Sequence, residues 1–143
     1  MNSLSPYLIA AAVAWVVAQG LKYVILSIKN RHIKSVRQLY LSGGMPSAHS
    51  ATVVALLVVI AAKDGLDSGL FGLAALMSAI VMYDAVMVRR SSGEQGASLT
   101  ALIKEQKSKV RLPRVAKGHT PREVVIGALV GWAIGLIVVL ATA

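Results

Sequence analysis

Two histidines stand in segments whose neighbouring residues suit phosphate chemistry. His49 lies in the stretch 43–50, GGMPSAHS, and His119 lies in the stretch 118–123, GHTPRE. Both segments lead directly into apolar stretches long enough to cross a bilayer. A neutral imidazole can attack phosphorus or carry a proton, and lysines and arginines can neutralise a phosphate. The two segments therefore predict phosphate chemistry on a lipid at one membrane face.

The first segment has the features of an anion-binding turn. Gly43 and Gly44 allow the backbone to bend tightly and to present successive N–H groups to an anion. We expect the following helix to begin at Pro46, where its free amides and dipole favour a phosphate and Ser47 adds a hydroxyl donor. His49 in the first turn would reach that phosphate. Taken alone, a glycine pair before a helix is more often an ordinary loop followed by a helix cap.

The second segment opens a helix whose polar and small residues share one face. After His119 and Glu123, Gly127, Gly131 and Gly135 continue the same four-residue spacing. For the glycines, a packing seam that lets another helix approach is the favoured explanation. The same face directs His119 and Glu123 into the bundle, where the carboxylate can accept the Nδ1 proton and leave Nε2 as a nucleophile. An ionisable pair at a membrane boundary favours function.

The elements that position these residues are predicted to be membrane-spanning helices. The chain has 143 residues, of which 56% are hydrophobic, which is too apolar for a small soluble domain. Four apolar blocks, at about 6–28, 46–62, 69–88 and 121–143, each approach the roughly 20 residues of a spanning helix. We therefore predict a single all-α membrane domain over 1–143, a bundle of four transmembrane helices. Helical spacing between Leu99 and Val110 predicts a basic amphipathic interfacial helix in the loop between the third and fourth spans.

The distribution of charge predicts the orientation of this bundle. The formal net charge is +9, and twelve of the fifteen lysines and arginines fall in the two loops on one side. The positive-inside rule places these loops in the cytoplasm and both termini outside, in a multi-pass protein of the cell membrane. Anionic lipid headgroups are the expected partner, and nucleic acid is not expected, because no aromatic residues interleave with the basic ones. The chain has no cysteine, which excludes disulfides and zinc–thiolate sites.

Charged residues near the ends of two spans are further candidates. Asp84 is costly near a helix end unless it is paired, so a salt bridge with Arg89 or Arg90 and a catalytic role are equally supported. Gln19 and Lys22 interrupt the first span. Lys22 can extend to the interface or face the bundle and meet an anion.

The scarcity of carboxylates argues against a metal-dependent site. A two-metal phosphatase needs several carboxylates, and the cytoplasmic side offers only four: Asp84, Glu94, Glu105 and Glu123. We expect lysines and arginines to neutralise the phosphate directly, with no metal and no cofactor.

At these residues the sequence resembles the type 2 phosphatidic acid phosphatase superfamily, and in particular its small divergent branch. The resemblance rests on three motifs in order: GGMPSAHS at 43–50, Asp84 with Arg89, Arg90 and Gly93-x-Gln95, and GHTPxEV at 118–124. It implies that His119 attacks phosphorus to form a phosphohistidine and that Glu123 orients it. It also implies that His49 protonates the leaving alcohol, while Ser47, the Gly43–Gly44 backbone and basic residues hold the phosphoryl oxygens.

The sequence departs from the main branch of that superfamily, whose motifs are K-x6-R-P, P-S-G-H and S-R-x5-H-x3-D. Ala48 replaces a glycine, and K-x6-R-P is missing, so Lys22 and Arg37 are the candidates for its role. Arg114 precedes His119 by five residues instead of six. Arg114, Lys117 or an arginine after the third span could therefore bind the phosphoryl group. Members of the main branch commonly have six spans, so four leave room for a homodimer.

Three functions follow from this reading. The first is a phosphatase that removes a phosphate monoester from a lipid of the cytoplasmic leaflet, such as phosphatidylglycerophosphate or phosphatidic acid. The alternative is a non-catalytic membrane protein whose basic loops bind anionic lipid or recruit a partner. A small transporter ranks last, because charged residues deep within the spans are missing.

Overall fold

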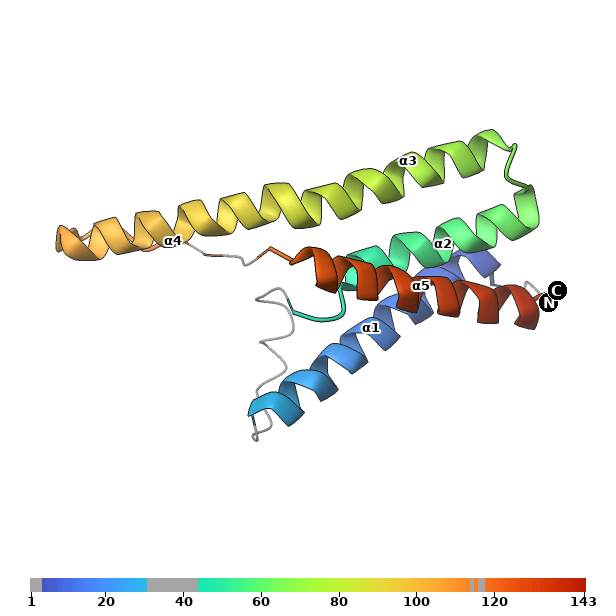
Figure 1. Cartoon of the computed structure of the whole chain (residues 1–143), viewed down its shortest axis with the longest axis horizontal. Coiled ribbons are helices and arrows are strands. Elements are labelled where there is room, and N and C mark those ends of the chain that lie inside the picture. Colours follow the sequence, from blue (N-terminus) through green and yellow to red (C-terminus); the bar gives the residue numbers. More distant parts are fainter. Residues whose placement is uncertain (1–3, 31–43, 114, 116–117) are drawn as a thin grey trace.

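The protein is a bundle of long helices. The computed structural model describes residues 4–30, 44–113, 115 and 118–143, and every regular element within them is helical. In chain order they are α1 (Pro6–Asn30), α2 (Ala48–Asp64), α3 (Gly69–Tyr83), the π-helical turn η2 (Asp84–Val88), α4 (Arg89–Glu105) and α5 (Pro121–Ala141). In Figure 1, α2, α3 and α5 run in roughly the same direction, α1 crosses α2 and α5 obliquely, and α4 continues α3 beyond the end of the bundle.

Three helical stretches are long and apolar enough to cross a membrane: Pro6–Ile28, Gly69–Glu105 and Pro121–Ala141. They agree with three of the four expected spans. The remaining one, α2, has 17 residues and is the central helix of the bundle, in contact with α1, α3 and α5. The described part of the chain is thus an all-helical membrane protein.

The start of α2 differs from the expectation by two residues. The helix begins at Ala48 and not at Pro46, because Ser47 is its N-cap. The Ser47 hydroxyl accepts hydrogen bonds from the Ser50 N–H at 3.4 Å and from the Ser50 hydroxyl at 3.0 Å. A serine that caps a helix in this way satisfies an amide that would otherwise lack a partner.

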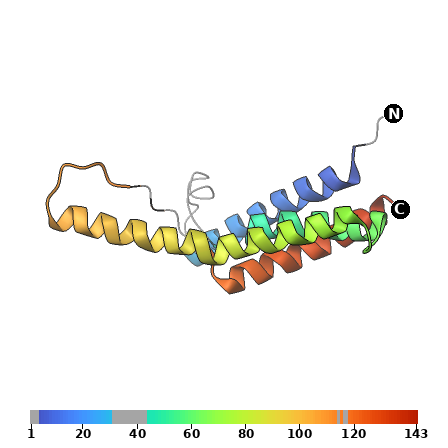
Figure 2. The same cartoon turned by 90° about the horizontal axis from the view of Figure 1, so that it is seen from above.

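The expected end of the third span and the separate interfacial helix are corrected by the structure. The helix does not stop at residue 88 but runs on through η2 and α4 to Glu105, in line with α3 (Figure 2). No proline interrupts the chain between Gly69 and Pro113, so nothing in the backbone forces the helix to end there. Its 37 residues correspond to about 55 Å, well beyond a hydrocarbon core of about 30 Å.

Small residues allow the helices of the bundle to pack closely. On α1, Ala10, Ala14 and Ala18 are fully buried. A Cβ atom on Gly131 of α5 would overlap with the carbonyl oxygen of Ala51 on α2, and the same holds for Gly127 against Ser47. The prediction that these glycines form a packing seam is confirmed. Close backbone approach of this kind is the usual basis of helix association in membranes.

The end of the bundle opposite the histidines is tied by polar contacts. The Tyr7 hydroxyl donates to Asp64 at 2.7 Å, and the Lys63 ammonium donates to the carbonyl oxygen of Thr142 at 2.9 Å. These contacts join the start of α1 and the end of α5 to the end of α2. Figure 1 shows the start of α1 and the end of α5 at this end, and the end of α1 and the starts of α2 and α5 at the other.

Candidate functional site

The start of α5 holds His119 in a defined orientation. Thr120 is the N-cap, Pro121 follows it, and Glu123 completes a capping box with the Thr120 backbone. The Glu123 Oε2 atom accepts the Thr120 N–H at 3.1 Å and lies 3.1 Å from Nδ1 of His119. One carboxylate therefore caps the helix and fixes the imidazole. With Nδ1–H donating to Glu123, Nε2 is left as the free ring nitrogen.

The turn before α2 is held against the same carboxylate. The Gly44 N–H donates to Glu123 Oε2 at 3.4 Å, and the Ser47 N–H donates to the Glu123 carbonyl oxygen at 3.1 Å. Gly44 has φ +122°, a region that side chains with a Cβ rarely adopt. The glycine predicted to form an anion-binding turn thus lies beside the histidine–glutamate pair.

Lys22 of α1 reaches this point from inside the bundle. It continues the buried line of Ala10, Ala14 and Ala18 and is itself only 4% exposed. Its Cε atom lies 3.9 Å from where a Cβ on Gly44 would be. Of the two orientations expected, the structure has the one that faces the bundle. Within the described residues, the Lys22 ammonium makes no hydrogen bond or ion pair.

The π turn η2 supplies a backbone contact to His119. The Arg89 N–H donates to the carbonyl oxygen of Asp84 and not to that of Ala85, its partner in a regular α-helix. The Ala85 oxygen instead accepts the His119 N–H at 3.0 Å. A Cβ on Gly118 would overlap with the Arg90 backbone, so glycine is needed for this close approach. Nothing in the sequence predicted η2 or this contact.

The charged residues around η2 form two neighbouring ion pairs. Asp84 pairs with Arg89, and Arg90 pairs with Glu94 at 3.1 Å between Nε and Oε1. The Arg90–Glu94 pair is well exposed, and it was not foreseen from the sequence. The salt bridge considered for Asp84 is present.

The electrostatic surroundings favour a neutral His119. Burial lowers the pKa of this imidazole below its ordinary value, the hydrogen bond to Glu123 acts in the opposite direction, and the charges of Lys22 and Arg89 lower the pKa further. His49 is exposed in the first turn of α2. It lies within electrostatic range of His119, Lys22 and Arg89, so α1, α2, α5 and the η2–α4 junction all contribute to one site.

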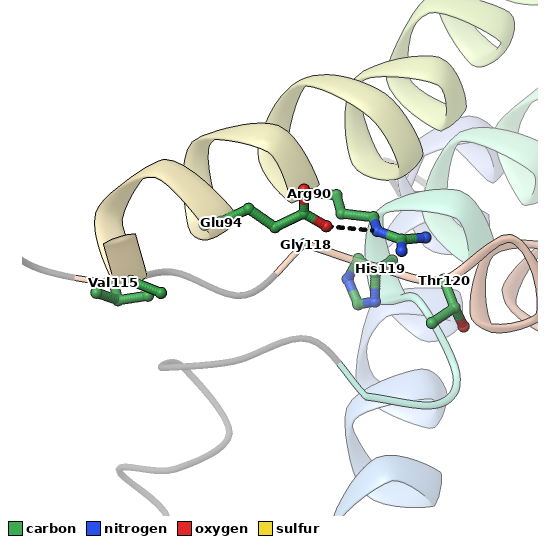
Figure 3. Close-up of a pocket in the computed structure, with 8 residues that line it drawn as sticks. Arg90, Glu94, Val115, Gly118, His119 and Thr120 are labelled. Atoms are coloured by element: carbon green, nitrogen blue, oxygen red, sulfur yellow. Dashed lines mark hydrogen bonds and ion pairs between the residues drawn. The ribbon is translucent and has the colours of Figure 1, made fainter. Parts of the chain in front are cut away.

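A cavity of about 320 Å³ opens beside His119, between α4 and the segment that returns to α5 (Figure 3). Its lining comprises Arg90, Gly93, Glu94, Ala97, Val115, Gly118, His119 and Thr120. The Arg90–Glu94 pair and His119 therefore face a shared space at the end of the bundle.

The other residues named from the sequence have different outcomes. Ser47 is fully buried and its hydroxyl is engaged as a helix cap, so its role as a phosphate donor stays a prediction. Arg37, Gly43, Arg114 and Lys117 lie outside the described residues. Within the described ranges, no group of three histidine or carboxylate side chains is placed to hold a metal ion.

Comparison with known proteins identifies the family. Residues 4–134 match the model of the divergent PAP2 family. The chain belongs to this family. The resemblance inferred from the three motifs is thus confirmed. This divergent PAP2 protein is also similar to a Bacillus subtilis (strain 168) protein described as uncharacterized membrane protein YuiD, with 34% identity over 145 residues and 91% of each chain covered. No solved structure matches the chain.

Proposed function

We propose that this protein is a membrane-embedded, metal-independent phosphatase that removes a phosphate monoester from a lipid. The observation that carries the proposal is Lys22, a residue only 4% exposed whose side chain lies beside Gly44 and within electrostatic range of His119 and Glu123. Its ammonium has no anionic hydrogen-bond partner among the described residues. A buried charge is costly unless it is paired. A phosphate bound between Lys22, the Gly44 turn and His119 supplies the missing counter-charge.

The first half of the reaction transfers the phosphoryl group to the enzyme. Nε2 of His119 attacks phosphorus, the ester P–O bond breaks, and His49 gives a proton to the leaving alcohol. The Nδ1–H group remains bonded to Glu123, which stabilises the ring as it becomes positively charged. Lys22 and Arg89 neutralise the charge on the transferring phosphoryl oxygens, which is the main task in this class of reaction.

The second half restores the enzyme. His49, now neutral, takes a proton from a water molecule that attacks the phosphohistidine, and inorganic phosphate leaves His119.

Metal-independence is supported by the partners of the nearby carboxylates. Asp84 pairs with Arg89, Glu94 pairs with Arg90, and Glu123 bonds His119. Each therefore already has a partner within the protein.

In this proposal α1, α2, α3 and α5 all cross a cell membrane, and the site faces the cytoplasm. Helix α2, at 17 residues, is about 26 Å long and approaches the thickness of the hydrocarbon core. The substrate is a cytoplasmic-leaflet phosphomonoester resembling phosphatidylglycerophosphate or phosphatidic acid. A second copy of the chain is proposed to complete the bundle.

The test is phosphate release by the purified protein in detergent. We expect turnover that resists EDTA, is inhibited by vanadate and falls at least about a thousandfold in His119→Ala, because no other group replaces the nucleophile. Ser98→Ala, on the exposed face of α4, is the matched control and keeps full activity. Full turnover by His119→Ala would end the proposal.

The alternative of a non-catalytic, lipid-binding protein is favoured by one observation. Lys104, Lys107 and Lys109 are exposed at and beyond the end of α4, which projects away from the bundle (Figure 1). If these lysines are the functional surface, replacing all three with glutamine abolishes binding to anionic vesicles, while His49→Ala and His119→Ala change nothing.

A further inference from the structure

Another cavity, of about 220 Å³, lies between α2 and α3, in the part of the bundle that we propose to cross the membrane. Its polar lining residue is Ser78, whose hydroxyl already donates to the Ala74 carbonyl oxygen at 2.8 Å. Among the described residues that line it, the cavity therefore offers a ligand apolar contact and no unpaired polar side chain. The apolar lining comes from both helices: Val53, Leu56, Ile60, Leu73, Ala74 and Met77.

His49 stands at the head of the α2 face that lines this cavity. Val53, Leu56 and Ile60 follow His49 at four, seven and eleven residues, a spacing that keeps all four on one face of the helix. Along the axis, Val53 is about 6 Å from His49 and Ile60 is about 16 Å from it. His49 itself is exposed. The cavity therefore begins about one helical turn from this imidazole and runs away from it.

The α3 side of the cavity leads to the same end of the bundle. Asp84 continues the helical spacing of Leu73 and Met77, at the point where α3 passes into η2. Helices α2 and α3 are joined by a short turn and run antiparallel (Figure 1). Asp84 also lies within electrostatic range of His49. Both walls of the cavity thus rise towards one part of the candidate site.

The proposed reaction places one part of the substrate at the head of this cavity. His49 gives its proton to the oxygen of the leaving alcohol, and in a lipid phosphate that oxygen joins the phosphate to the hydrocarbon part of the molecule. A chain that starts at His49 gains apolar contact along Val53, Leu56 and Ile60. The same course keeps the chain away from the ion pairs at η2 and α4, whose charges are costly to remove from water.

We infer that the cavity between α2 and α3 holds a hydrocarbon chain of the lipid substrate, and that the leaving alcohol carries a chain long enough to fill it. The inference rests on the proposed function, and it names the part of the protein that selects a long-chain lipid over a short-chain phosphate ester. A packed chain also limits the movement of the alcohol oxygen beside His49. Residues such as Ala74 are then specificity residues, in contact with the chain and not with the phosphate.

The first test fills the cavity and follows phosphate release from two substrates, dioleoyl glycerol phosphate and its short-chain dibutyryl form. Ala74→Phe adds a ring inside the cavity. Ala79→Phe is the matched control, the same substitution on the same helix at an exposed position that does not line the cavity. The ratio of kcat/KM between variant and wild type is taken for each substrate separately, so that differences in micelle partitioning cancel.

We expect Ala74→Phe to lower kcat/KM for the dioleoyl substrate by about tenfold, a modest discrimination for an apolar pocket, and to keep the dibutyryl substrate within about twofold of wild type. Ala79→Phe should preserve both values. Retained turnover of the dibutyryl substrate shows that the site of Ala74→Phe is intact. Equal losses for both substrates in a variant that unfolds at the wild-type temperature, or no loss for either, overturn the inference.

The second test uses the wild type and does not depend on turnover. A non-hydrolysable phosphonate analogue of the dioleoyl substrate carries a photoreactive diazirine midway along one chain, and the labelled residues are mapped by mass spectrometry. We expect labels on the lining, at Leu56 and Leu73, that are lost when unlabelled dioleoyl glycerol phosphate is added. Phosphatidylcholine with the same diazirine is the control, and it should label the exposed Leu76 and Ile80 of α3 without such competition.

Equal labelling of the lining by both probes identifies bulk membrane lipid as the occupant and overturns the inference. A change of oligomeric state in Ala74→Phe without selective labelling also overturns it and identifies a second copy of the chain as the occupant. Phosphate release from no lipid counts against the proposed function instead. Selective labelling by the phosphonate probe then still establishes the cavity as a site for the chain of a lipid phosphate.

Discussion

A single carboxylate oxygen organises the candidate site at the scale of individual residues. Oε2 of Glu123 accepts the N–H groups of Thr120 and Gly44 and bonds Nδ1 of His119. It therefore links the helix cap, the glycine turn and the imidazole. Because three contacts depend on one atom, a change at Glu123 affects the start of α5 and the protonation of His119 together.

Two substitutions should shift the titration of His119 in opposite directions. The pKa of this histidine is lowered by burial and by Lys22 and is raised by the bond to Glu123. Its midpoint, followed by NMR of the imidazole, should lie below the ordinary value of about 6.5. Glu123→Gln should lower the pKa further because the charge is lost, and Lys22→Met should raise it.

The same shift predicts the acid limb of the activity profile. His119 acts as a nucleophile only when it is neutral, so activity is retained above its pKa and is lost as the pH falls through it. The acid limb of kcat/KM should therefore lie below pH 6.5 and move to higher pH in Lys22→Met. A limb that stays in place while the NMR midpoint moves would show that another group controls it.

At the scale of elements, the seam between α2 and α5 has no room for a side chain. Gly131→Ala should destabilise the protein by about 3 kcal/mol, because the new Cβ meets the backbone of Ala51. Gly72→Ala on α3 has open space around it and should be neutral or slightly stabilising, as expected for a glycine within a helix. Thermal unfolding in detergent measures both. Equal effects of the two substitutions contradict the packing.

The contact between η2 and the return segment should matter more for turnover than for binding. Gly118→Ala places a methyl group against the Arg90 backbone and displaces His119 from the Ala85 carbonyl. We expect kcat to fall about a hundredfold with little change in KM, because misplacement of a nucleophile costs reaction rate. Gly20→Ala, with nothing near its Cβ position, is the control, and a similar loss in that variant argues against a positioning role.

The residue pattern was enough to predict the helices and the faces that they present. It did not predict the π turn, where the Ala85 carbonyl accepts a hydrogen bond from outside its own helix. The starts of α1 and α5 follow from the apolar blocks, and the glycine seam and the His119–Glu123 pair follow from helical spacing. The π turn does not, since residues 84–88 have no composition that distinguishes them from an α-helix. The continuation into α4 was missed because polar residues after Val88 resemble a loop, although no proline ends the helix.

At the scale of the whole molecule, the bundle has two distinct ends, which we propose lie on opposite sides of the membrane. The start of α1, the end of α5 and the α2–α3 turn lie at one end, and the starts of α2 and α5 lie at the other, with α4 extending beyond them (Figure 1). The chain has no cysteine, so single cysteines can be introduced without background. Ser98→Cys should react with an impermeant maleimide only in inside-out vesicles. Asp67→Cys and Ala143→Cys should react only in right-side-out vesicles.

The reverse pattern of labelling would place the histidines outside the cell and make an extracytoplasmic lipid the substrate. Labelling of Asp67→Cys and Ser98→Cys from the same side would mean that α3 does not cross the membrane. Either result leaves the geometry of the His119–Glu123 pair intact, because that pair depends on contacts within the bundle.

The continuous helix from Gly69 to Glu105 has two parts with different surroundings. Its first part, α3, packs against α2, and its last part, α4, extends beyond the bundle (Figure 1). The Ala85 carbonyl that accepts the His119 N–H belongs to the π turn between the two parts. A twist or tilt of α4 would therefore be transmitted to the backbone of His119. If the protein is the phosphatase proposed above, a partner that binds α4 would change the position of the nucleophile without any contact with the lipid.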